Sequence, residues 1–146
     1  MKHVLFVDDQ LSTLEYYISK LKEQGYEVDT AFTGQDALDR IRDNKYDLIV
    51  LDIMMPYHRM EDLLQLTDEE ILHAPEENVK TGVRIYRELS KSPTRPPIVI
   101  LSARSEADIR RISREMECEL PADLICLHKG LDDPADILGS IEKGLH

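Results

Sequence analysis

The fold of this chain is decided by the stretch Tyr46-Asp47-Leu48-Ile49-Val50-Leu51-Asp52-Ile53-Met54-Met55-Pro56. Four large apolar residues, Leu48 to Leu51, form an unbroken run that leads directly into the acid Asp52, and Pro56 follows four positions later. A short apolar run bounded by breakers predicts a strand that is buried on both faces, as in a parallel sheet. An acid after such a strand lies at the carboxyl edge of the sheet, where open α/β sheets bind their ligands.

Three further apolar runs also end in polar residues. They are Val4–Val7 before Asp8 and Asp9, Ile98–Leu101 before Ser102, and Leu124–Leu127 before His128 and Lys129. Because the carboxyl ends of parallel strands meet at one edge of a sheet, we expect these polar side chains to converge on Asp52. Their joint occurrence, strand after strand, is hard to explain as packing alone.

Amphipathic helical patterns separate the predicted strands. Leu14, Tyr17, Ile18 and Leu21 fall at the spacing of one buried helix face, and Gly25 stands where a glycine ends a helix. The chain between Tyr26 and Thr30 alternates like a half-exposed edge strand. The same reasoning predicts helices around 37–41, over 106–117 and from Pro134 onward. Strands that alternate with helices predict an α/β fold with a doubly wound parallel sheet and right-handed crossovers.

The regular alternation is interrupted after Pro56. About 25 residues separate it from Gly82, where a loop between a strand and a helix usually takes 2–6. Thr67-Asp68-Glu69-Glu70 has the pattern of a capping box, and Pro75 ahead of two glutamates is typical of a first helical turn. We therefore expect one short helix near 60–72 and a longer helix from about 76 to 90.

Length and composition fit one domain of 146 residues, and an apolar content of 42% supports a real core. The net charge of −11 and the pI near 4.8 argue against nucleic acid as a partner, because that needs a basic surface. Cys118 and Cys126 form neither a disulfide framework nor a CxxC motif, which favours a reducing cytoplasm. Asp8 breaks the first apolar run too soon for a signal peptide, and no stretch reaches the roughly 18 apolar residues of a membrane span.

The acids at the predicted sheet edge indicate a metal-assisted phosphoryl site. Asp8, Asp9 and Asp52 would repel one another unless a cation joins them, or else their pKa values must rise. A set of oxygen ligands without cysteine or histidine suits Mg²⁺ or Mn²⁺. Ser102 adds a hydroxyl and Lys129 a compact positive charge, both suited to phosphoryl oxygens. The combination predicts an aspartate that attacks phosphorus and becomes an acyl phosphate.

At this point the residues match a known family. The chain resembles the receiver domain of bacterial two-component response regulators over essentially its whole length apart from 57–78. The matching blocks are Val7-Asp8-Asp9, Leu51-Asp52-Ile53-Met54-Met55-Pro56, Leu101-Ser102-Ala103 and His128-Lys129. The resemblance implies a flavodoxin-like (CheY-like) five-stranded sheet of order 2-1-3-4-5 with helices on both faces. It also implies a single receiver domain, 1–146, with 57–78 inserted between the third strand and the third helix.

The resemblance implies a function as well. A sensor histidine kinase or phosphotransfer protein would phosphorylate Asp52, and the chain would act as a stand-alone signalling switch on a downstream protein target. It would not be an enzyme beyond Mg²⁺-dependent self-phosphorylation from small donors and autodephosphorylation. Ser102 and Lys129 would contact the phosphoryl group. The metal would be held by Asp9, Asp52 and the Met54 backbone carbonyl, with Asp8 acting largely through water.

Three departures from the family pattern concern how phosphorylation would be transmitted to the rest of the domain, rather than the phosphorylation site itself. Gly130 follows the lysine where the family usually has proline, which puts the expected cis peptide in doubt. Cys126 stands where the family usually carries the tyrosine or phenylalanine that swings inward on phosphorylation. The family's glycine normally comes about eight residues after the aspartate block, whereas Gly82 lies thirty after Asp52.

Two other function classes compete with the phosphorylated switch. A receiver-like interaction module that works without phosphorylation is favoured by the missing aromatic residue and disfavoured by the complete set of site residues. A hydrolase of the haloacid-dehalogenase type needs a second acid two residues after its nucleophile, and here that position is Met54. Nucleotide binding is disfavoured because the chain has neither a GxGxxG motif nor a P-loop.

Overall fold

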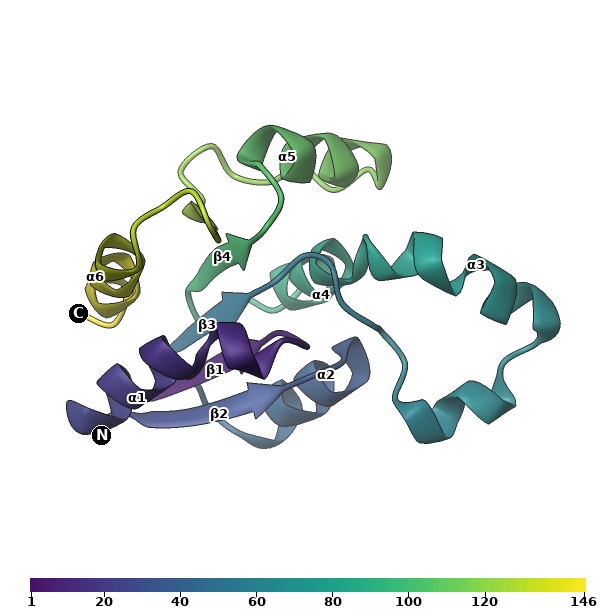
Figure 1. Cartoon of the computed structure of the whole chain (residues 1–146). Helices are drawn as coiled ribbons and strands as arrows, with labels where there is room; N and C mark the ends of the chain where they lie inside the picture. The colour runs from purple at the N-terminus through teal and green to yellow at the C-terminus, as the bar shows by residue number, and fades with distance from the viewer.

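A parallel sheet of five strands in the order β2-β1-β3-β4-β5 forms the centre of the structure, a computed structural model that describes residues 1–146 (Figure 1). This order confirms the predicted flavodoxin-like architecture. The strands are β1 (His3–Val7), β2 (Glu27–Ala31), β3 (Leu48–Leu51), β4 (Ile98–Ser102) and β5 (Cys126–His128).

Helices cover both faces of the sheet (Figure 1). The α-helices are α1 (Glu15–Glu23), α2 (Gly34–Asp43), α3 (Asp68–Asn78), α4 (Thr81–Ser90), α5 (Glu106–Glu115) and α6 (Pro134–Gly144), with short 3-10 helices η1 (Leu11–Thr13) and η2 (Met60–Gln65). Helices α1 and α6 pack on one face, and α2, α4 and α5 pack on the other. No helix is long and apolar enough to cross a membrane.

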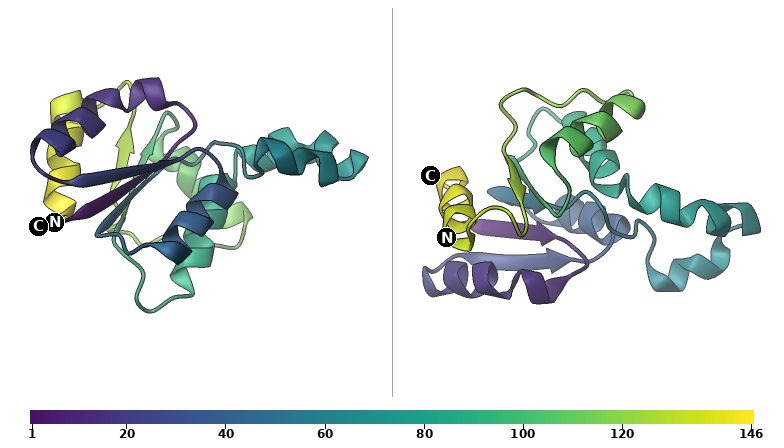
Figure 2. Two further views of the ribbon diagram at one scale, coloured as in Figure 1. Left: turned by 90° about the horizontal axis from the view of Figure 1, so that it is seen from below. Right: turned by 45° about the horizontal axis from the view of Figure 1, so that its top comes forward.

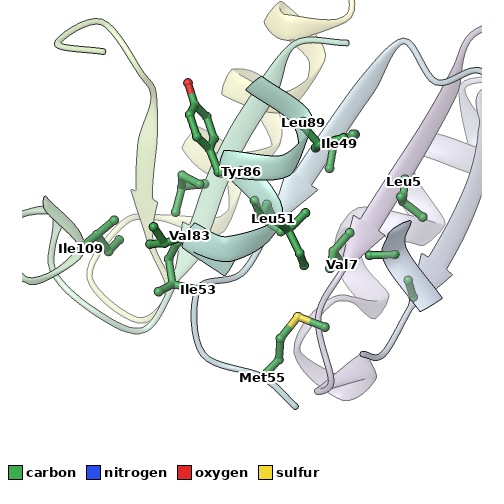
Figure 3. Close-up of a cluster of buried hydrophobic side chains, with 14 of the residues drawn as sticks. Leu5, Val7, Ile49, Leu51, Ile53, Met55, Val83, Tyr86, Leu89 and Ile109 are labelled. Carbon is green, nitrogen blue, oxygen red and sulfur yellow. The ribbon is translucent and has the colours of Figure 1, made fainter. Parts of the chain in front are cut away.

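Alternation along the strands divides the apolar side chains between two cores. On β1, Leu5 and Val7 belong to the core beneath α2, α4 and α5, whereas Val4 and Phe6 belong to the core beneath α1 and α6. Figure 3 shows the first core, in which Val83 of α4 lies over the central strands. Because both faces of β3 are covered, all four of its residues are buried.

The fifth strand begins later than the sequence predicted. A strand over Leu124–Leu127 was expected, but β5 starts at Cys126. The backbone N–H of Leu124 donates to the Pro121 carbonyl at 3.2 Å, so this part of the chain is still in a turn. Pairing with β4 starts at the Ile125 carbonyl, which accepts from the Ile100 N–H at 2.9 Å.

The helices after Pro56 also differ from the prediction. The capping box is present, since Thr67 accepts from the Glu70 N–H and the Glu70 carboxylate accepts from the Thr67 N–H, both at 3.1 Å. The predicted helix over 76–90 with Pro75 at its first turn is wrong, because α3 runs through Pro75 and a new helix, α4, begins at Thr81. The helix is interrupted between α3 and α4, because the Asn78 carbonyl accepts a hydrogen bond from the Met55 N–H at 3.0 Å instead of continuing the helix.

The segment that contains η2 and α3 projects away from the sheet in every view (Figures 1 and 2). Its base is attached to the start of α2. The Pro56 and Tyr57 carbonyls accept from the Gly34 and Gln35 N–H groups at 3.0 and 2.9 Å, two donors that a helix start leaves free.

The peptide bond between Lys129 and Gly130 is trans, as no peptide bond in the structure is cis. Gly130 has a φ of 88°.

Candidate functional site

Asp52 lies at the carboxyl end of β3, directly after the buried apolar run. Its N–H donates to the Val7 carbonyl at 2.9 Å, so pairing with β1 fixes its backbone. The residue is 6% exposed; Oδ1 accepts from the Ile53 N–H at 2.7 Å, and Oδ2 lies 3.4 Å from Lys129 Nζ. Burial, and next the charge of Asp8, raise the pKa of Asp52 to about 6, although Lys129 opposes the shift.

The end of β1 brings two further carboxylates to the same place. Asp8 is 3% exposed, its Oδ1 accepts from the Gln10 N–H at 2.9 Å, and its Oδ2 is ion-paired with Lys129 Nζ. Asp9 is exposed, and partial burial and the charge of Asp8 raise its pKa. Carboxylate oxygens of Asp8, Asp9 and Asp52 lie within 4.8 Å of one another. Three acids therefore share one lysine.

Ser102 and Lys129 come from neighbouring strands on the other side of Asp52. Ser102 ends β4 and is 1% exposed, and its Oγ accepts from the Arg104 N–H at 3.1 Å. The Lys129 N–H donates to the Ser102 carbonyl at 2.8 Å, which continues the parallel pairing past β5. Burial lowers the pKa of Lys129, but the hydrogen bonds and charges of Asp8 and Asp52 outweigh burial and leave it raised.

These residues border a cavity of about 360 Å³ at the carboxyl edge of the sheet. Of the predicted site residues, Asp9, Asp52, Met54, Ser102 and Lys129 line it, and buried Asp8 lies beside it against Lys129. The structure thus brings together all the residues that sequence reasoning assigned to the site.

Two side chains from different loops meet at this cavity. Arg104 Nη2 lies 3.7 Å from Met54 Sδ, and Nη1 of the same guanidinium donates to Asp108 Oδ2 at 3.2 Å. Asp108 therefore holds the guanidinium next to Met54, and both side chains line the cavity.

Sequence reasoning missed part of the cavity wall. It includes Gln10, Pro75, Asn78 and Val79. Nothing in these residue types marks a phosphoryl site. The available signal was chain connectivity, because a long excursion from the Asp52 loop has to return to the sheet beside that loop.

Comparison with known proteins finds one family that resembles the amino-terminal part of the chain. Residues 4–69 match the model of the response regulator receiver domain. Over 56 residues the chain is 39% identical to response regulator ArlR of Staphylococcus aureus, a stretch that covers 38% of this chain. Residues 4–69 are therefore similar to the response regulator receiver domain family. The match spans only 26% of the length of the ArlR protein.

Solved structures of receiver domains match almost the entire chain. Response regulator protein TrrA from Thermotoga maritima, solved in complex with Mg²⁺–BeF, is 27% identical, with a TM-score of 0.66 and coverage of 99% of this chain and 100% of that one. A CheY-like receiver domain protein from Methanospirillum hungatei JF-1 is 19% identical, with a TM-score of 0.68 and coverage of 99% of this chain and 94% of that one. At this low identity the similarity shows a shared fold only. Receiver domains of this family are signalling domains of two-component systems rather than conventional enzymes.

Gly82 contacts the aspartate loop directly, despite the long segment that separates the two in the sequence. The Gly82 N–H donates to the Ile53 carbonyl at 2.9 Å, and a Cβ at Gly82 would lie 2.2 Å from the Asp52 carbonyl oxygen. Only glycine allows so close an approach of α4 to the loop. The glycine is displaced along the sequence but stands directly against Asp52 in space.

Proposed function

We propose that this receiver domain, residues 1–146, is a phosphorylated signalling switch in which Asp52 is the phosphoacceptor. A sensor histidine kinase or phosphotransfer protein supplies the phosphoryl group, and a downstream protein target reads it. The observation that carries the proposal is the position of the Asp52 carboxylate, which borders an open cavity, 3.4 Å from Lys129 Nζ and beside two further acids.

The side chains have distinct roles in the transfer. An Asp52 oxygen forms the new O–P bond while the bond from phosphorus to the donor's leaving group breaks and the leaving group keeps the electron pair. Lys129 and the Ser102 hydroxyl are close enough to the cavity to bind oxygens of the transferred group. The ion pair with Asp8 holds Lys129 beside Asp52 before the donor arrives.

The acidic cluster also fits a divalent cation. It offers only oxygen donors, and three carboxylates exceed the single positive charge of Lys129. Mg²⁺, or Mn²⁺ in its place, would be held by Asp9, Asp52 and the Met54 carbonyl, with Asp8 acting through water, and would supply positive charge to the phosphoryl oxygens.

Intact-mass measurement tests the phosphoacceptor. The wild-type protein, incubated with acetyl phosphate and Mg²⁺, is expected to gain one phosphoryl group, and Asp52→Ala is expected to gain none. Asp123→Ala removes an exposed aspartate outside the site and is the matched control, which should label like the wild type. Labelling of Asp52→Ala to the same extent as the wild type, or no labelling of the wild type, would refute the proposal.

One observation favours a second candidate function, an interaction module that works without phosphorylation. Cys126 is half-buried at the start of β5, in the place where the family usually carries the switch aromatic, so an inward ring movement is not available here. In that case Asp52→Ala would bind the protein's partner as tightly as the wild type does.

A further inference from the structure

The part of the chain that projects from the sheet (Figures 1 and 2) contains an apolar groove between its helices. It has a volume of about 570 Å³ and is formed mainly between η2 and α3. We call it the insertion groove and define it by six of its lining residues: Met60, Leu63, Leu64, Ile71, Ala74 and Pro75.

The insertion groove exposes apolar side chains in an unusual concentration. Met60 is 80% exposed, Leu64 is 93% exposed and Ile71 is 51% exposed, and neither η2 nor α3 buries any residue. Exposed apolar residues that gather in one concave place mark a binding surface more often than those that stand singly. The exposed apolar residues of the groove therefore form a surface suited to docking rather than a part of the core.

The groove is held in place before any partner arrives. Arg59 at the start of η2 forms ion pairs with Asp36 and Asp39 of α2 and lies 3.5 Å from Asp62. The guanidinium of Arg84 on α4 lies 3.6 Å above the Tyr57 ring. These contacts attach the base of the groove to two helices of the main body, and a preformed surface loses less entropy when it binds.

Charge decides which kind of partner fits. Residues 57–78 contain seven acids and one arginine, a net charge of −6. That arginine, Arg59, is already paired with aspartates. A second copy of this chain, with a net charge of −11, would be repelled. An amphipathic helix whose apolar face is flanked by lysine or arginine satisfies both the apolar groove and its acidic surroundings.

The groove shares a wall with the Asp52 cavity. Pro56, Pro75 and Asn78 line both spaces. Asn78 is also tied to the aspartate loop, since its carbonyl accepts from the Met55 N–H at 3.0 Å. Pro56, Pro75 and Asn78 are therefore within reach of a group that fills the Asp52 cavity and also shape the groove, and contacts of this kind are what coupling between two sites requires.

We propose that the insertion groove binds a basic amphipathic helix of a partner protein, and that phosphorylation of Asp52 changes the affinity of this helix. The second clause rests on the proposed function. The first stands by itself, because neither Asp52 nor any other residue proposed to bind the phosphoryl group lines the groove.

A model peptide tests the docking clause on the whole chain. The probe is a fluorescently labelled helix of about 18 residues, with leucine at i, i+3, i+4 and i+7 and lysine elsewhere. Its controls are the same helix with glutamate for lysine and a scrambled peptide of identical composition. Fluorescence anisotropy is expected to show at least roughly tenfold tighter binding of the basic helix than of either control, equivalent to about 1.4 kcal/mol.

Exposed residues allow substitutions that leave the fold intact. The double variant Leu64→Gln, Ile71→Gln should weaken binding by at least about tenfold, because central apolar anchors carry most interface energy. Leu131→Gln is the matched control, since Leu131 is 80% exposed outside the groove, and it should bind like the wild type. Equal affinity of the double variant and the wild type, or no binding of the basic helix, would overturn the proposal. A wild-type dimer that Leu64→Gln dissociates would overturn it in favour of a second copy.

Beryllofluoride with Mg²⁺ tests the coupling clause. The affinity of the basic helix is expected to change by at least roughly threefold, equivalent to about 0.7 kcal/mol, in the wild type and to stay constant in Asp52→Ala. Unchanged affinity in the presence of beryllofluoride, for a protein that acetyl phosphate labels at Asp52 in the mass measurement, would overturn the coupling while leaving Asp52 as phosphoacceptor.

Discussion

The contact between Gly82 and the aspartate loop predicts that Gly82→Ala is severely destabilising. The added methyl carbon would lie 2.2 Å from the Asp52 carbonyl oxygen and 2.5 Å from the Ile53 Cα. Both are backbone atoms of the segment that leaves β3, so neither can rotate away as a side chain would. Helix α4 would have to move by more than about 1 Å, which is more than a close-packed core accommodates without strain.

The magnitude follows from this geometry. Overpacking of a core costs typically about 1–3 kcal/mol, and the backbone contact places Gly82→Ala at or above the upper end. The Val83 and Tyr86 side chains would move with the helix and lose part of their packing on the central strands (Figure 3). A domain of this size has a free energy of unfolding of roughly 5–15 kcal/mol, so a loss of about 3 kcal/mol is readily measured.

Urea denaturation followed by circular dichroism measures this loss. The matched control is Gly139→Ala in α6, where an added Cβ would meet nothing within 4 Å. That variant should be stabilised by about 0.5–1 kcal/mol, because alanine is the better helix former. The two variants are therefore expected to differ by roughly 4 kcal/mol in opposite directions from the wild type. A free energy of unfolding of Gly82→Ala within about 0.5 kcal/mol of the wild type would show that α4 is not packed tightly against the Asp52 loop.

Three further predictions concern the acids, the cavity and the insertion. In EDTA, thermal denaturation should show Asp9→Asn at least as stable as the wild type, because burial and the charge of Asp8 outweigh the attraction of Lys129 and raise the pKa of Asp9. Asp8→Asn should lose about 1–3 kcal/mol because it breaks the ion pair with Lys129. A large loss of stability in Asp9→Asn would make Asp9 a structural cap. Met54 lines the Asp52 cavity, where its bulky side chain would obstruct the water that attacks the phosphorylated Asp52. Met54→Asn should therefore accelerate phosphate loss by roughly 3- to 10-fold, and an unchanged rate of phosphate release would contradict this obstruction by Met54. Arg59→Ala should speed hydrogen exchange over residues 57–66 while strands β1 and β3 stay protected. Unchanged exchange over residues 57–66 would show that contacts other than those of Arg59 keep this segment ordered.

Much of the fold could be predicted from the sequence because its signals are local. The run from Leu48 to Leu51 predicted a strand with both faces buried, and the structure has it at the same four residues. Pro134 predicted the start of a helix, and α6 does begin there, capped by Asp133, which accepts from the Ala135 N–H. Strand ends that carry acids, a serine and a lysine predicted their convergence, because parallel strands place their carboxyl ends at one edge.

The errors arose where distant backbone groups compete with local preference. Pro75 before two glutamates has the composition of a first turn, yet the capping box at Thr67 starts the helix earlier, and the helix ends only where Asn78 pairs with Met55. Neither the Met55 hydrogen bond nor the wall that Asn78 contributes to the Asp52 cavity could be inferred from residue types. Both depend on where the chain returns to the sheet.

The return of the chain also explains how a receiver domain tolerates so long an excursion beside its site. Hydrogen bonds from Met55 to Asn78 and from Gly82 to Ile53 bring the two ends of the excursion together at the aspartate loop. Lengthening the connection from about eight residues to about thirty costs only about 1 kcal/mol of loop-closure entropy. The ion pairs of Arg59 with α2 and the capped helix α3 then order most of the added residues. The excursion therefore adds a wall to the Asp52 cavity and an apolar groove behind that wall, while the position of Asp52 against α4 stays fixed by Gly82.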